Sequence, residues 1–85
     1  MRHASEQALD SLEAVLRQIR KHEGLTERKR GIFYRGSSAL LHFHEDPDGL
    51  FADLRVGAQW ERFPLSTRSG QRAFLSRVAA IASKT

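Results

Sequence analysis

Residues 31–56 read GIFYRGSSALLHFHEDPDGLFADLRV, which is three short runs of aromatic, β-branched and aliphatic residues separated by two turn signals. The first signal is the Gly-Ser pair at residues 36–37. The second is Asp-Pro-Asp-Gly at residues 46–49, where proline suits the second position of a turn and glycine its left-handed exit. Two short turns between three such runs predict an antiparallel meander, and the expected strands are residues 31–35, 38–44 and 50–56.

The segment before the meander has the periodicity of an amphipathic helix. Apolar residues recur at helical spacing from Leu9 to Ile19, and Ser5 is a suitable N-cap. We therefore expect a helix over residues 5–21, with Gly24 closing it in the left-handed conformation.

The segment after the meander carries a second helical stripe, which runs from Phe74 to Ala82. Ser66 and Thr67 are the N-cap candidates for this last helix, and Gly70 is a weak position in its first turn. The order is therefore helix, strands, helix.

Two further segments are less regular. Residues 26–30 (TERKR) read as a charged connector. The pattern of residues 60–65 predicts a weaker fourth strand, and Pro64 confines that strand to an edge of the sheet. Trp60 is expected to cap the core at the edge of the sheet, with its ring N–H bonded locally.

Both helices need a surface on which to bury a stripe, so they are expected to share one face of the sheet. The predicted fold class is α+β: a two-layer domain in which an antiparallel three- or four-stranded sheet carries the N- and C-terminal helices on one face. Eighty-five residues fit one domain, 1–85, and we expect frayed tails at residues 1–4 and 83–85.

Composition restricts the function classes. Cysteine is absent, which excludes disulfide scaffolds, thiolate zinc sites and thiol nucleophiles and suits a reducing compartment. No apolar run reaches the length of a membrane span, and the first ten residues lack the apolar core of a secretion signal. We expect a cytoplasmic protein that does not contact membranes. The net charge of +4 permits acidic partners without requiring them.

Alternation along the strands assigns each residue to a face once the turns fix the register. A two-residue first turn pairs Phe33 with Leu40. The second turn sets His44 opposite Phe51 and His42 opposite Asp53. The face expected under the helices is apolar and collects Ile32, Tyr34, Ala39, Leu41, Phe43, Leu50, Ala52, Leu54 and Val56. The other face mixes aromatic, basic, imidazole and carboxylate groups, and we predict it to be the binding face: Phe33, Arg35, His42, His44, Phe51, Asp53 and Arg55.

A metal site is one interpretation of the histidines on this face. His42 and His44 project side by side from one strand and could hold zinc with Asp53 as a third ligand and an open position for water. The pattern is short, and His3 and His22 fall in the tail and at a helix end. We therefore expect two sheet histidines, one of them paired with Asp53, without a metal or another cofactor.

Catalysis is not expected. Ser37 or Ser38 can be combined with His42 and Asp53 as a triad, but a flat sheet in a short chain offers little pocket, and no nucleophile elbow is present. Residues 45–49 lack the spacing and the distal glutamate of a calcium loop.

The same face could instead bind a macromolecule. Phe33 and Phe51 could stack bases while arginines meet phosphates, although Asp53 lies in the middle of the patch and no RNP-type motif is present. Aromatic and arginine residues are equally typical of protein interfaces. We predict an interaction domain that binds a protein partner or a second copy of itself. Nucleic-acid binding is the alternative, and a His/Asp metal-binding protein is the second alternative.

The segments GIFYRGSSALLHFHEDPDGLFADLR, WERFPLST and QRAFL resemble a group of short, uncharacterised bacterial proteins with an FLHFHED…GLFADLR…ERFPV pattern. More remotely, the arrangement is similar to the bacterial luciferase-domain family, in which a histidine-rich strand precedes a DLR-like strand and a closing helix. It is also similar to YjbR-like proteins, which share the helix–sheet–helix order. These resemblances imply a bacterial α+β domain, and the last implies DNA binding. None implies a catalytic residue, a flavin site or light emission.

Overall fold

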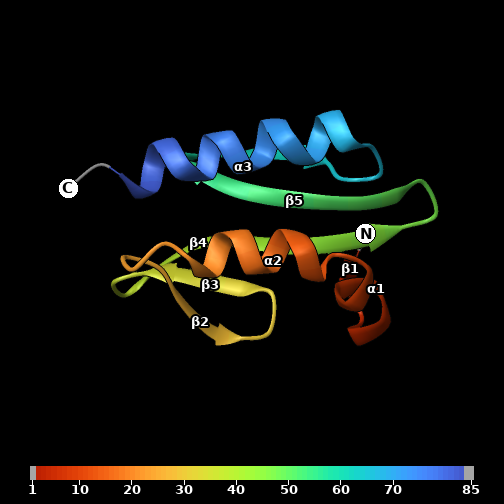
Figure 1. The fold of residues 1–85 in the computed structure, drawn as a ribbon, viewed down its shortest axis with the longest axis horizontal. Helices are drawn as coiled ribbons and strands as arrows, with labels where there is room; N and C mark the ends of the chain where they lie inside the picture. Colours follow the sequence, from red (N-terminus) through yellow and green to blue (C-terminus); the bar gives the residue numbers. More distant parts are fainter. Residues whose placement is uncertain (1, 84–85) are drawn as a thin grey trace.

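The computed structural model describes residues 2–83, which form one sheet and three helices (Figure 1). In chain order the elements are β1 (Arg2–His3), α1 (Glu6–Ser11), α2 (Glu13–Arg20), β2 (Thr26–Lys29), β3 (Ile32–Arg35), β4 (Ser38–Asp46), β5 (Gly49–Val56), β6 (Gln59–Pro64) and α3 (Arg68–Ala82). The predicted α+β class is confirmed, and the predicted fourth strand forms as β6.

The sheet is antiparallel, with the strand order β2-β3-β4-β5-β6. The nine-residue strand β4 is long enough to pair with two strands along one edge. Its first half pairs with β3, and its second half pairs with β1 through His3 opposite His44. The prediction of a frayed tail at residues 1–4 is thus wrong for residues 2–4, because Ala4 also donates its N–H to the carbonyl of Phe43. Residues 1, 84 and 85 of the predicted tails lie outside the described residues.

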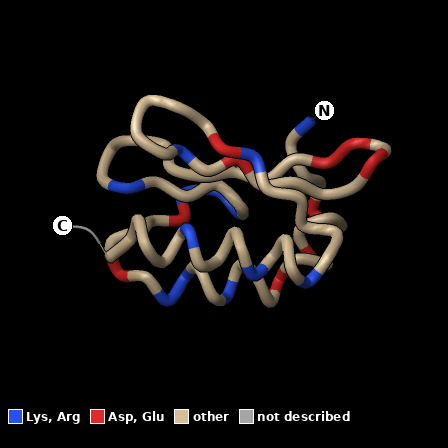
Figure 2. Tube along the Cα trace, turned by 90° about the horizontal axis from the view of Figure 1, so that it is seen from above, with Lys and Arg blue, Asp and Glu red and all other residues tan. Residues whose placement is uncertain are grey.

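The helices lie on one side of the sheet, so that the molecule has two layers (Figure 2). Helices α2 and α3 cover a face whose central strand residues are buried, and the core joins the two layers. It consists of Leu9, Leu12, Val15, Leu16, Ile19, Phe33, Leu40, Leu41, Phe43, Ala52, Leu54, Leu65, Phe74 and Val78. Burying this many apolar side chains is the main source of stability in a domain of this size.

Capping residues set the helix ends. The Ser5 hydroxyl accepts a hydrogen bond from the N–H of Ala8, and the Thr67 hydroxyl accepts one from Gly70, so both predicted N-caps are confirmed. The predicted helix over residues 5–21 is interrupted at Leu12, where α1 ends and α2 begins. Gly24 does not take the predicted left-handed conformation, since it is not among the glycines with positive φ.

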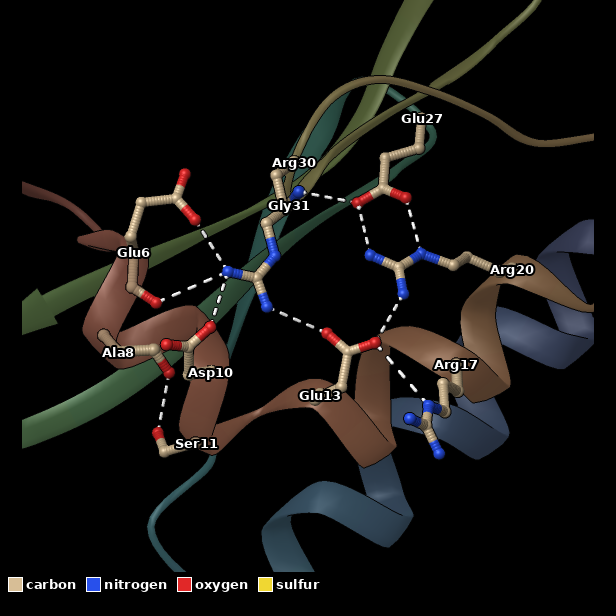
Figure 3. Close-up of polar contacts among 10 residues, drawn as sticks. All are labelled: Glu6, Ala8, Asp10, Ser11, Glu13, Arg17, Arg20, Glu27, Arg30 and Gly31. Carbon is tan, nitrogen blue, oxygen red and sulfur yellow. Dashed lines mark hydrogen bonds and ion pairs between the residues drawn. The ribbon is translucent and has the colours of Figure 1, made fainter.

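Residues 26–30 were predicted to be a connector, but residues 26–29 form the edge strand β2. A turn at Gly31, whose φ is +83°, returns the chain into β3. The carboxylate of Glu27 accepts the Gly31 N–H and two hydrogen bonds from Arg20 on α2 (Figure 3). Glu27, one of the charges that suggested a solvated loop, therefore joins the β2–β3 hairpin to α2.

A bulge between β3 and β4 changes which residues of β3 face the core. Arg35 pairs with Ser38 across the two-residue turn, but Phe33 pairs with Leu41 and not with the predicted Leu40. The extra residue in β4 lets both Leu40 and Leu41 pack in the core, and it carries Phe33 into the core with them. The predicted positions of Phe33 and Arg35 on the open face are therefore wrong: Phe33 is 1% exposed, and Arg35 donates to the carbonyl of Ile81 on α3.

Candidate functional site on the open sheet face

The face of the sheet away from α2 and α3 is hereafter the open face. Directly opposed residues in an antiparallel pair share a face, so the registers of β1, β4, β5 and β6 define its members. In sequence order they include His3, His42, His44, Asp46, Phe51, Asp53, Arg55, Trp60 and Arg62. Of the predicted binding residues, His42, His44, Phe51, Asp53 and Arg55 are placed here as expected.

Asp53 is at the centre of the open face and is its most buried charged residue, at 8% exposed. Arg62 lies directly opposite Asp53 on β6 and donates two hydrogen bonds to its carboxylate. Nε of Arg62 lies 2.8 Å from Oδ1, and a terminal guanidinium nitrogen lies 3.0 Å from Oδ2. These bonds hold the pKa of Asp53 below its ordinary value, so the carboxylate stays ionised. The negative charge that argued against a nucleic-acid surface is therefore paired within the protein.

His44 is the histidine that contacts this carboxylate. Its Nε2 lies 3.2 Å from Oδ2 of Asp53, although His42 is the residue directly opposite Asp53 in the register. The prediction that one histidine pairs with Asp53 across the strands is confirmed. An ionised carboxylate only accepts hydrogen bonds, so this contact favours the imidazole tautomer with its proton on Nε2.

Three imidazole rings meet beside this pair. The ring centroids of His42 and His44 are 4.6 Å apart, and His3 stacks on His44 at 5.4 Å. One ring nitrogen from each of the three histidines lies within 4.8 Å of the others. The Nδ1 atoms of His42 and His44 are buried and have no hydrogen-bond partner among the described residues. Burial, together with the neighbouring His44, lowers the pKa of His42, which keeps its imidazole neutral at neutral pH.

Trp60 projects from β6 beside these histidines. It was predicted to cap the core, but it is 44% exposed and is the one large apolar side chain exposed among residues 2–83. Its ring lies 5.0 Å from the His42 ring, and the Arg55 guanidinium lies over its face at 5.7 Å. A pocket of about 410 Å³ opens between Trp60, Arg62 and the groups around Asp53.

Sequence reasoning missed His3 and the exposure of Trp60. The pairing of β1 with β4 joins segments far apart in the chain, and no local pattern encodes it. Trp60 could have been found, because the alternation along β6 puts it on the side of Arg62, opposite the half-buried Phe63 that packs on the core.

Comparison of the chain with protein-family models, with curated proteins and with solved structures finds no match. Within the described part of the chain, no helix is long and apolar enough to cross a membrane. The site must therefore be interpreted from its own geometry.

Proposed function

We propose that this protein is a binding domain that acts through its open face and that the partner at this face is a second copy of the chain. The proposal rests mainly on the exposure of Trp60, a large aromatic side chain whose ring packs against His42 and Arg55 and still faces solvent. Tryptophan and arginine are the residues that most often dominate the binding energy of protein interfaces.

The distribution of charge on the open face favours a second copy over an unrelated partner. At one end of the sheet, Arg55 lies over Trp60 on the open face, and Arg28 on the neighbouring edge strand β2 lies 4.2 Å from the Tyr34 ring. The other end is the turn with Asp46 and Asp48, and the length of β4 separates the two ends by about 26 Å. Two copies related by a twofold axis near His42 would each set the acidic turn against the arginines of the other, as a self-complementary interface requires.

The nucleic-acid alternative has less support. Of the residues on which it relied, Phe33 and Arg35 lie in the core and against α3, and Arg62 is bound to Asp53. Only Phe51 and Arg55 of that set are left on the open face without such an engagement to the core or to Asp53. The predicted bacterial, cytoplasmic setting stays a prediction, and it is compatible with either partner.

Sedimentation velocity over a concentration series tests the proposal. We expect the wild type to move from monomer to dimer, and we expect Trp60→Ser combined with Arg55→Glu to stay monomeric at every concentration. Both side chains are exposed, so the variant should unfold at the same temperature as the wild type when both are dilute enough to be monomeric. Arg68→Glu makes the same charge change on α3 and should still dimerise.

A charge-swap variant adds specificity to this test. Adding Asp48→Arg to Arg55→Glu restores opposite charges across a twofold interface and should recover part of the dimer. A wild type that is monomeric throughout would refute the proposal. The nucleic-acid alternative would replace it if that monomer were retained on single-stranded oligonucleotides, with retention lost in Trp60→Ser and weakened by salt.

A further inference from the structure

The three histidines of the open face have a geometry that self-association does not explain. His3, His42 and His44 come from two strands, and each offers a nitrogen within 4.8 Å of the other two. A tetrahedral zinc ion with Zn–N bonds of about 2.1 Å holds its ligand nitrogens about 3.4 Å apart. The nitrogens therefore lie within about 1.4 Å of metal-binding separations, and a turn of the exposed His3 side chain on its two-residue strand would close that gap.

The histidines also have lone pairs available. The Nδ1 atoms of His42 and His44 are removed from solvent and accept no hydrogen bond within residues 2–83. A buried polar atom without a partner is costly, and such atoms in native proteins mark an unseen water, an ion or a functional role. The described residues thus leave one ring nitrogen of His42 and one of His44 without a partner, as an ion bound at this cluster would require.

The surroundings of His44 match those of a metal ligand. Histidine ligands commonly present their second ring nitrogen to a carboxylate, which fixes the tautomer and makes the coordinating nitrogen more basic. Nε2 of His44 lies 3.2 Å from Asp53, which leaves the unpartnered Nδ1 as the coordinating atom. Asp53 is itself fixed by the two hydrogen bonds from Arg62, so the carboxylate is held in place before any metal arrives.

From this geometry we propose that His3, His42 and His44 form a three-histidine site for a divalent transition metal of the zinc class, with Asp53 as the carboxylate that orients His44. The sequence prediction had named Asp53 as a ligand and left His3 out. Three neutral imidazoles suit zinc, cobalt, nickel or copper and disfavour magnesium and calcium, which prefer oxygen ligands. Three protein ligands leave a fourth position for water, next to the pocket lined by Trp60 and Arg62.

The site can be tested with untagged full-length protein and two metals. Isothermal titration with zinc should give one metal per chain. Cobalt(II) should give the intense visible absorption of a tetrahedral ion. His3→Gln should weaken zinc binding by at least tenfold and abolish the tetrahedral cobalt spectrum, because a two-histidine remainder cannot fix that geometry. His22→Gln removes a histidine outside the cluster and should bind both metals as the wild type does.

A variant of the supporting carboxylate completes the test. Asp53→Asn keeps the shape of the side chain and removes its charge, and it should weaken zinc binding about 10- to 100-fold while the stoichiometry stays at one. His3→Gln leaves Trp60 and Arg55 in place, so its effect on metal binding is separable from dimerisation. Less than stoichiometric zinc on the wild type would overturn the proposal. So would zinc binding that His3→Gln leaves unchanged, or that His22→Gln weakens equally.

Discussion

Gly70 sits in the first turn of α3, where the helix begins directly against the end of β6. A Cβ atom built at this position would collide with the backbone carbonyl oxygen of Pro64 and would also press on the Thr67 hydroxyl. The colliding atom belongs to the backbone, so it cannot move aside as a flexible side chain would. Glycine is therefore required here by a close approach of two elements, although the sequence alone suggests a weakness in the helix.

Replacement of Gly70 by alanine should consequently destabilise the protein. In an ordinary helix the same change stabilises by about 1 kcal/mol. Here we expect a loss of 1 kcal/mol or more, measured as a lower urea midpoint with an unchanged slope. Gly24→Ala is the matched control, because nothing lies within 4 Å of its Cβ and its φ is not positive; it should be neutral or slightly stabilising. A Gly70→Ala variant as stable as the control would show that α3 can shift away from β6 without cost.

At the scale of elements, charged side chains join the β2–β3 hairpin to the helices, in addition to the packing of Phe33 in the core. Arg30, in the turn after β2, donates to Glu6 and Asp10 on α1 and to Glu13 on α2 (Figure 3). Arg20 on α2 bridges Glu13 to Glu27 of the edge strand. Individual exposed ion pairs contribute little, but a connected set with a half-buried member such as Glu27 contributes more.

This network predicts a loss of stability in acid. Hydrogen bonds from Arg30 and Arg20 lower the pKa of Glu13. Burial of Glu27 alone would raise its pKa, but bonds from Arg20 and the Gly31 N–H more than offset this, so its pKa is also lowered. A carboxylate with a lowered native pKa stabilises the fold above its unfolded pKa of about 4.3, and the contribution is lost as the pH falls through the native value.

Urea unfolding at a series of pH values from neutral to 3 measures this loss. The wild type should lose stability steeply below about pH 4.3. Glu27→Gln should be less stable at neutral pH and should lose less on acidification, because one of the titrating groups has been removed. Parallel curves for the two proteins would contradict the assignment of acid sensitivity to Glu27. Unfolding monitored by circular dichroism reports the whole fold and suits this comparison.

The elements also show where sequence reasoning reaches its limit. Strands β4 and β5 could be predicted with their register, because a short turn between them fixes the pairing of His42 with Asp53 and of His44 with Phe51. The bulge in β4 could not be predicted, because nothing in the sequence SALLHFH indicates which residue is left unpaired. That single extra residue moved Phe33 from the predicted binding face into the core.

At the scale of the whole molecule, the two layers give the domain two different surfaces. Helices α2 and α3 carry charged residues (Figure 2), whereas the open face carries the exposed Trp60 and His3 and the partly buried His42 and His44. The α+β class and the location of the helices on one face followed from periodicity alone. The histidine cluster did not, because it requires β1 to return beside β4, a contact between distant parts of the chain.

The central claim is that the open face is the surface through which this protein binds. Nitrogen–proton correlation spectra of labelled protein, recorded from dilute to concentrated solution without added metal, test it residue by residue. We expect concentration-dependent shifts to gather on β4, β5 and β6, with the indole N–H of Trp60 among the largest, and to spare α2 and α3. Shifts centred on the helices, or spectra that do not change with concentration, would contradict it.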